Sequence, residues 1–115
     1  LHIVARQVEG RGDDRQLTLA FRLYQEGRFT QAYKEVAALL FSQPDYLPAR
    51  NLRGLIYMAK GKYEDALTDL QAYYVAHPEE TDTAYNIGLA LLYRNSLRES
   101  IEAFSAVITA HPDDF

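Results

Sequence analysis

Apolar residues recur every three or four positions through most of the chain, and short breaks containing glycine, asparagine or proline separate the stretches. The stretch after residue 28 places its apolar residues on one helical face: Phe29, Ala32, Val36, Leu39 and Leu40. The stretches at 14–26, 48–60 and 83–94 are apolar around more of their circumference. The pattern predicts alternating pairs of helices, with a first helix (A) and a second helix (B) in each pair.

The breaks repeat at a fixed distance. Pro44, Pro78 and Pro112 lie 34 residues apart (78 − 44 and 112 − 78). Other positions keep the same step, namely Gly27, Gly61 and Asn95; Ala20, Gly54 and Gly88; and Ala32, Ala66 and Ser100. A period of this size is the signature of a stacked repeat array. We predict three repeats, at 13–46, 47–80 and 81–114, preceded by a non-repeat segment at 1–12.

The central repeat carries a recognisable set of residues at fixed spacing: Gly54, Tyr57, Gly61, Tyr63, Ala66 and Pro78. This set resembles the tetratricopeptide repeat, and the resemblance covers nearly everything after Gly12. It implies an all-α fold, a right-handed α–α solenoid of three helix-turn-helix repeats. The large aromatic residue at the family's fourth position is absent, since Gln16, Arg50 and Ala84 stand there.

Small residues mark the expected contacts between paired helices. Gly54 on the A helix and Ala66 on the B helix should let the two backbones approach. A larger side chain at Gly54 is expected to cost about 1–3 kcal/mol by overpacking. Asn95 replaces the turn glycine of the other repeats, because asparagine also tolerates the left-handed conformation.

Composition excludes several classes of protein. The formal net charge is −4 with charges of both signs and no basic stripe, so nucleic acid is not an expected partner. No apolar run approaches the about 18 residues that a membrane-spanning helix needs. The chain has no cysteine, which excludes disulfides and thiolate metal sites and leaves the compartment open. It begins at Leu1 without a signal pattern, so we expect a piece of a longer protein or a processed form.

No catalytic constellation, metal site or cofactor motif stands out. His77 and His111 occupy equivalent positions, but stacked repeats separate such positions by about 10 Å, too far to share a zinc ion easily. The glycines follow the repeat and form no phosphate loop. The Arg11–Gly12–Asp13 tripeptide matches an adhesion motif, but so short a motif often arises by chance, and a turn whose Asp13 or Asp14 caps the first helix is the favoured interpretation. We therefore predict a protein that is not an enzyme and has no cofactor.

A second apolar stripe on the A helices faces away from their B partners. The resemblance implies that A helices line the concave face, where these residues would form a partner-binding groove: Leu17, Phe21, Tyr24, Asn51, Leu55, Met58, Tyr85, Asn86, Leu89, Leu92 and Tyr93. An apolar patch of this kind usually marks a binding site. The alternative is that the stripe packs A helix against A helix, or against residues 1–12.

The sequence thus predicts a scaffold that binds a peptide or helix of a partner protein, with Asn51 and Asn86 bonding its backbone. An export or assembly chaperone holding an apolar cargo segment is a second hypothesis. Self-assembly through the last helix, with Ile101, Phe104 and Ile108 exposed, is a third. The family's carboxylate-binding members use Lys, Arg and Asn at positions that here hold other residues, so we do not expect a carboxylate clamp: Leu17, Phe21, Leu52, Asp82 and Asn86.

Overall fold

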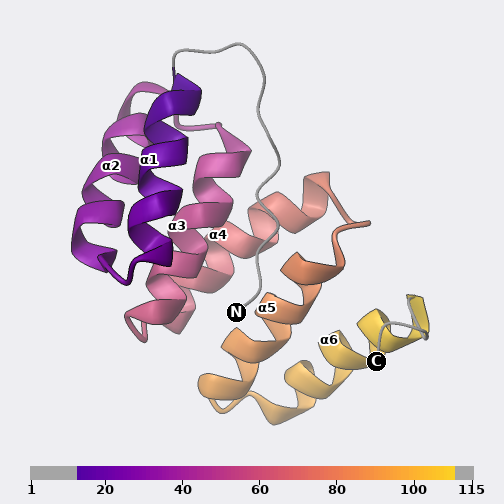
Figure 1. Cartoon of the computed structure of the whole chain (residues 1–115). Helices are drawn as coiled ribbons and strands as arrows, with labels where there is room; N and C mark the ends of the chain where they lie inside the picture. The colour runs from indigo at the N-terminus through magenta and orange to yellow at the C-terminus, as the bar shows by residue number, and fades with distance from the viewer. Residues whose placement is uncertain (1–12, 111–115) are drawn as a thin grey trace.

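The computed structural model describes residues 13–110 and contains six helices in that range, with no strand among the described residues. They are α1 (Asp13–Gln25), α2 (Phe29–Ser42), α3 (Leu47–Ala59), α4 (Tyr63–Ala76), α5 (Thr81–Tyr93) and α6 (Leu97–Ala110) (Figure 1). The predicted all-α helical-repeat fold is confirmed. The expectations for segment 1–12, the Arg11–Gly12 part of the tripeptide, and His111 concern residues outside the described range.

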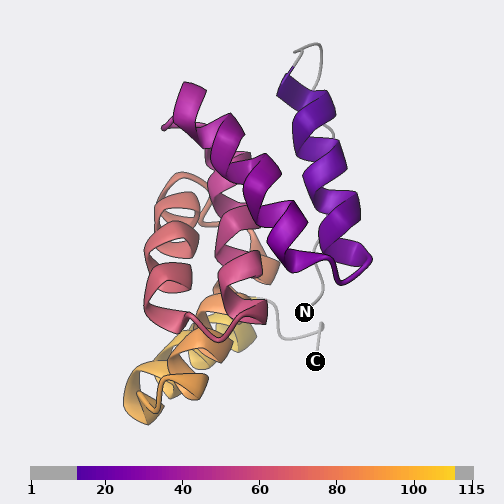
Figure 2. The same cartoon turned by 90° about the vertical axis from the view of Figure 1, so that its left-hand side faces the viewer.

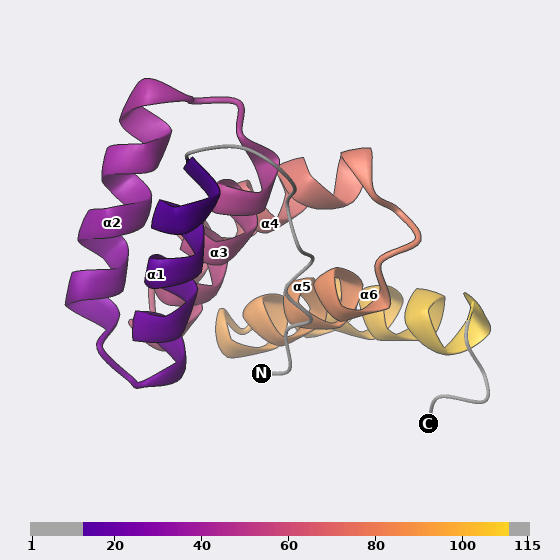
Figure 3. The ribbon, with the colours of Figure 1, turned by 45° about the horizontal axis from the view of Figure 1, so that its top comes forward.

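The helices form three hairpins that follow one another along the chain (Figure 2). Helices α1, α3 and α5 begin 34 residues apart (47 − 13 and 81 − 47), and α2, α4 and α6 do the same (63 − 29 and 97 − 63). Each A helix packs on the B helix that follows it, and α2 and α4 also pack on the next A helix. Figure 3 shows α5 and α6 running at a steep angle to α1 and α2. Such a rotation between units is the geometry of a solenoid.

The turn inside each hairpin requires a residue with a positive φ. Gly27 has φ 77°, Gly61 has φ 75° and Asn95 has φ 69°. Glycine adopts this conformation without steric cost, and asparagine is among the few other residues that do so readily. The sequence-based expectation that Asn95 replaces the turn glycine is confirmed.

Within each hairpin, the residue on the A helix is matched in size to the residue it faces. A Cβ placed on Gly54 would lie 2.9 Å from the Leu70 side chain, and one placed on Gly88 would lie 2.6 Å from the Phe104 ring. The first hairpin has Ala20 and Val36 at these two positions, both fully buried in one core cluster. A larger partner on the B helix thus accompanies a smaller residue on the A helix.

Two apolar clusters form the core, one after the other along the solenoid. The first joins α1, α2 and α3, and includes Val36, Leu52 and Ile56. The second joins α3, α4 and α5, and includes Leu70 and Leu91. Tyr24 packs against both clusters, so the core is continuous from the first hairpin to the third.

Candidate partner-binding surface

The three predicted groove residues of α1 lie partly exposed at the edge of the first core cluster. Leu17, Phe21 and Tyr24 all pack against that cluster and remain half-buried. The rings of Phe21 and Tyr24 stack at 6.4 Å between centroids, and Tyr24 also lies 5.6 Å from the Phe29 ring. Burial raises the pKa of the Tyr24 hydroxyl. The ring contacts hold these side chains in place while part of each stays available to solvent.

Two predicted groove residues of α3 lie in the core instead. Leu55 is fully buried and Met58 is 6% exposed, and both belong to the second cluster. That cluster includes Ile87, Ala90 and Leu91 of α5, so contacts between successive repeats take up their surface. The prediction that Leu55 and Met58 line an open groove is therefore wrong, and for them the alternative of packing between A helices holds.

Helix α5 carries the most exposed part of the predicted surface. Tyr93 is 56% exposed, Tyr85 39% and Leu92 38%, while Leu89 is half-buried against the second cluster. The Tyr85 ring lies 5.6 Å from the Phe104 ring, and the Tyr93 ring lies 5.5 Å from the Tyr63 ring. Each tyrosine therefore rests on an aromatic neighbour and presents its remaining surface outward.

The side-chain oxygens of both predicted asparagines are buried and accept no hydrogen bond. This holds for Asn51 Oδ1 on α3 and Asn86 Oδ1 on α5, and the whole Asn86 residue is only 2% exposed. A buried polar atom left unpaired costs about 1–3 kcal/mol. The prediction that Asn86 lines an open groove is therefore wrong, because this residue is buried, whereas Asn51 is half-buried. Each of the two oxygens would gain free energy if a donor reached it.

The three terminal-helix residues differ from one another. Ile101 is 65% exposed and Ile108 is 50% exposed, as expected. Phe104 is only partly exposed, because the absence of a side chain on Gly88 lets its ring pack over α5. The expectation of an exposed Phe104 was therefore wrong.

Sequence analysis missed a buried ion pair between α3 and α4. Asp69 is 1% exposed and accepts hydrogen bonds from Arg53 Nε at 2.7 Å, Arg53 Nη2 at 2.8 Å and Arg50 Nε at 3.2 Å. The bond to Asp69 raises the pKa of the Arg53 guanidinium. Arg50 occupies the position of the family's aromatic residue, and the carboxylate and the two guanidinium groups take its place in joining the helices.

Comparison of the three repeats could have predicted this ion pair, because the same two positions change together from one hairpin to the next. Gln16 donates to Glu35 at 3.4 Å in the first hairpin, where Glu35 and Asp69 share the 34-residue step (69 − 35). The third hairpin has alanine at both positions, Ala84 and Ala103. The two positions therefore change together, from a polar pair to an ionic pair to an apolar pair.

A tyrosine pair joins the first two hairpins. Tyr33 on α2 and Tyr57 on α3 share a hydrogen bond of 3.3 Å between their hydroxyl oxygens. Burial, and then the bond to Tyr33, raise the pKa of Tyr57 to about 12. Lys60 Nζ lies 5.1 Å from the centroid of the Tyr33 ring, where the ring face attracts a cation. These contacts join α2 of the first hairpin to α3 of the second.

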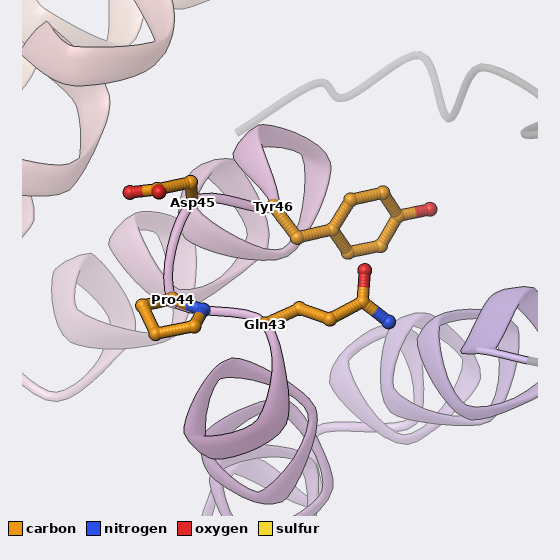
Figure 4. A pocket seen from close by; sticks show the side chains of 4 residues that line it. All are labelled: Gln43, Pro44, Asp45 and Tyr46. Atoms are coloured by element: carbon orange, nitrogen blue, oxygen red, sulfur yellow. The ribbon is translucent and has the colours of Figure 1, made fainter.

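The remaining features are a small hollow in a loop and the results of searches for metal sites and membrane-spanning helices. A hollow in the α2–α3 loop is lined by Gln43, Pro44, Asp45 and Tyr46, and Figure 4 shows the Asp45 carboxylate pointing away from the Gln43 and Tyr46 side chains. Across residues 13–110, no three His, Cys, Asp or Glu side chains gather in a way that could hold a metal ion. No helix in that part of the chain is long and apolar enough to cross a membrane.

Comparison with known proteins identifies the family. The sequence pattern of the tetratricopeptide repeat matches residues 17–81, more than half of the chain, so the chain belongs to the tetratricopeptide repeat family. No curated protein sequence matches the chain significantly.

Solved structures share the fold at low sequence identity. MamA from Desulfovibrio magneticus RS-1 is 23% identical with a TM-score of 0.81, over 87% of this chain and 56% of that chain. The type III secretion translocator chaperone SycD of Yersinia enterocolitica is 19% identical with a TM-score of 0.79, over 94% of this chain and 82% of that chain. A mutant O-GlcNAc transferase from Thermobaculum terrenum is 22% identical with a TM-score of 0.77, over 90% of this chain and 21% of that chain. The chain thus spans just over half of MamA and about a fifth of the transferase.

Proposed function

We propose that the A helices bind an apolar segment of a partner protein and that the chain itself catalyses no reaction. The supporting observation is the exposure of Tyr85, Leu92 and Tyr93 on α5, a helix that buries Ile87, Ala90 and Leu91 in the core. Apolar surface of this kind is stabilised when a partner covers it. The proposed inner surface comprises Leu17, Phe21, Tyr24, Asn51, Tyr85, Leu89, Leu92 and Tyr93, and Asn86 lies buried beneath it.

Charge favours an uncharged partner segment. The positions that hold cations in the family's carboxylate-binding members carry apolar, amide or acidic side chains here, and Asp82 would repel a carboxylate. None of the eight inner-surface residues is charged, and Asn86 is neutral too. The binding energy therefore comes from apolar burial and aromatic contacts, with the tyrosine hydroxyls at the rim.

The two unpaired amide oxygens favour an extended segment over a helix. Asn51 and Asn86 lie on neighbouring A helices, whose axes are typically 8–10 Å apart. An extended segment in the polyproline II conformation has three residues per turn and rises about 3.1 Å per residue, so N–H groups three residues apart face the same side about 9 Å apart and match that spacing. A helix bonds its own N–H groups beyond the first turn and offers few to an acceptor. Rotation of the Asn86 amide toward the surface is part of this binding mode.

The test compares partner affinity with stability in the same variants. The partner is first isolated by cross-linking the full-length parent protein and identifying what is bound by mass spectrometry. Phe21→Ala and Leu89→Ala should each weaken binding by about tenfold or more, since each removes a half-buried apolar anchor. Val75→Ala on α4 is the matched control, because Val75 is 81% exposed and lies outside the inner surface.

Asn86 gives a sharper test of the same surface. Asn86→Leu removes the unpaired oxygen, so it should leave stability unchanged or increase it while weakening partner binding. Binding is measured by calorimetric titration and stability by urea unfolding. Unchanged affinity in all three variants, with the helical circular dichroism preserved, would exclude this surface.

A chaperone for an apolar cargo is the second candidate. SycD is described as a secretion translocator chaperone, and the present chain covers 82% of it, a larger share than for MamA. Co-expression should keep one aggregation-prone partner soluble, and the Phe21→Ala variant should not. A partner that is equally soluble on its own would remove this candidate.

The last helix favours a third activity, self-association. Ile101 and Ile108 expose 65% and 50% of their surface on α6, on a face that the rest of the described chain does not cover. A solvent-exposed apolar face on a terminal helix is stabilised when another helix packs on it. We propose that this face joins copies of the chain.

A further inference from the structure

Helix α3 carries a row of cationic and aromatic side chains along one side. Arg50, Arg53, Tyr57 and Lys60 are separated by three, four and three positions (53 − 50, 57 − 53 and 60 − 57), so they lie on the same side of the helix. We call these four residues the cationic row. An α-helix has 3.6 residues per turn, so Asn51 of the inner surface points to a different side of α3.

At its first end, the cationic row has more positive charge than the fold neutralises. Arg53 alone bonds both oxygens of the Asp69 carboxylate, through Nε at 2.7 Å and Nη2 at 2.8 Å. Arg50 adds a single, longer bond to the same carboxylate, at 3.2 Å. The two arginine side chains remain 24% and 26% exposed. Across residues 13–110, Asp69 is the one carboxylate within 4 Å of either guanidinium group, so one positive charge stays without a counter-ion.

At its other end, the cationic row has a hydroxyl hydrogen to donate. Tyr33 on α2 and Tyr57 share one hydrogen bond between their hydroxyl oxygens, at 3.3 Å. Two hydroxyls carry two hydrogens and this bond uses one, so the second is left for another acceptor. Lys60 Nζ lies 5.1 Å from the centroid of the Tyr33 ring and adds a third cation. An oxyanion bound here would accept an O–H bond close to an ammonium group.

The other hairpins pack without these charges. The positions equivalent to Arg50, Arg53 and Tyr57 hold uncharged side chains, namely Gln16, Leu19 and Leu23 in the first hairpin, and Ala84, Ile87 and Leu91 in the third. The third hairpin still pairs its two helices and packs on α4. In the central repeat, three cations around one carboxylate leave a local net charge of +2 (3 − 1), in a chain whose formal net charge is −4. Packing alone therefore does not account for the cations of the central repeat.

We propose that the cationic row binds an acidic segment of a partner protein, with one carboxylate on Arg50 and Arg53 and another on Lys60 and the free tyrosine hydroxyl hydrogen. Guanidinium groups suit carboxylates, because their N–H groups match the spacing of the two oxygens. Arg50 and Lys60 are ten positions apart (60 − 50), which is about 15 Å along a helix. A single small anion is too short for that length. Acidic side chains about four residues apart in an extended segment match it, since such a segment rises about 3.3 Å per residue.

This site goes beyond the proposed function, because it lies on a different side of α3 from the inner surface and takes a partner of opposite character. The inner surface is uncharged and favours apolar segments, whereas the cationic row favours carboxylates. Attraction between exposed charges is screened by salt, so binding at the cationic row should depend on ionic strength.

The first experiment titrates the full chain into a fluorescently labelled peptide of eight glutamates and follows the fluorescence anisotropy. Binding should be measurable at about 20 mM salt and should weaken by roughly tenfold or more at about 200 mM, because salt shortens the range of charge attraction. A peptide of eight glutamines, which has the same length and no charge, should not bind.

The second experiment repeats the titration with matched variants. Arg50→Gln should weaken octaglutamate binding by about tenfold, because it removes one cation while both Arg53 bonds to Asp69 stay in place. Lys60→Gln should also weaken it, and because Lys60 is exposed this variant leaves packing undisturbed. Arg98→Gln is the control, since it removes the same charge from an exposed position of α6, which among the described helices contacts only α5. Circular dichroism and urea unfolding check that each variant is folded.

Phe21→Ala should leave octaglutamate binding unchanged, so failure of this inference and failure of the inner-surface proposal are told apart. Inorganic phosphate should displace the peptide no better than chloride at equal ionic strength. Displacement by phosphate at lower ionic strength would reassign the cationic row to a small phosphate ligand and overturn the acidic-segment proposal. Absence of octaglutamate binding at low salt would exclude the site. An equal loss of affinity in Arg50→Gln and Arg98→Gln would mean general charge attraction only, which also overturns the proposal.

Discussion

Substitution of Gly88 tests the size matching between paired helices. A Cβ at this position would lie 2.6 Å from the Phe104 ring, whereas carbon atoms in contact prefer about 3.5–4.0 Å, so the ring must retreat by about 1 Å. Overpacking of this kind costs about 1–3 kcal/mol. Replacing glycine by alanine inside a helix stabilises the helix by about 1 kcal/mol, which offsets part of that cost. We therefore expect Gly88→Ala to lower the unfolding free energy by about 1 kcal/mol, or to lower Tm by about 4–8 °C.

The first hairpin supplies the compensating change. It places Ala20 and Val36 where the third has Gly88 and Phe104, and both residues are fully buried. In the Gly88→Ala/Phe104→Val variant the clash is absent, so the two substitutions should couple favourably by about 2 kcal/mol in a double-mutant cycle. Urea unfolding of the wild type, both single variants and the double variant measures this. Strict additivity, or a Gly88→Ala protein as stable as the wild type, would refute the size-matching argument.

Two further predictions concern the polar contacts of α3. Arg53→Met should lower the free energy of unfolding by about 3 kcal/mol, because it leaves the buried Asp69 carboxylate with one arginine. Asp69→Asn should lower it by less, because both arginines can reach water. Urea unfolding that ranks the two variants in the opposite order would contradict the assignment of this ion pair. The pKa of Tyr57 is raised from 10.0 to about 12, so its contribution to stability is fully present below pH 10 and is lost as pH rises through 12. The Tyr57→Phe variant should lose less stability than the wild type across that interval, and parallel stability curves would count against the raised pKa of Tyr57.

Sequence periodicity predicted the helices and turns because both depend on local chemistry. The 34-residue step located each hairpin, and the left-handed turn at Asn95 followed from the preference of one side chain. Burial was predicted less well, because it depends on which surfaces meet. Leu55 and Met58 have the same pattern on their helix as Leu89 and Leu92, yet contacts between α3 and α5 bury only the first two. Among the described residues, the central hairpin contacts a hairpin on each side, whereas the third contacts only the one before it.

The ion pair of Asp69 shows a different limit. Arg50 and Arg53 have the appearance of ordinary surface residues on an apolar helix, and nothing in their own segment marks Asp69 as their partner. Only comparison across repeats reveals that Glu35, Asp69 and Ala103 change in step with Gln16, Arg50 and Ala84. Contacts between helices are thus readable from one sequence where an internal repeat supplies its own comparison.

The position of α6 has a consequence for how the molecule opens. Among the described helices α6 contacts only α5, while α3 contacts α1, α2, α4 and α5. In a linear array each unit draws its stability from its neighbours, so a helix with one neighbour has the smallest free energy of local opening. Amide protons of α6 should therefore exchange with solvent before those of α3 and α4. Whatever occupies the outer face of α6 would slow that exchange and protect the chain where it unravels first.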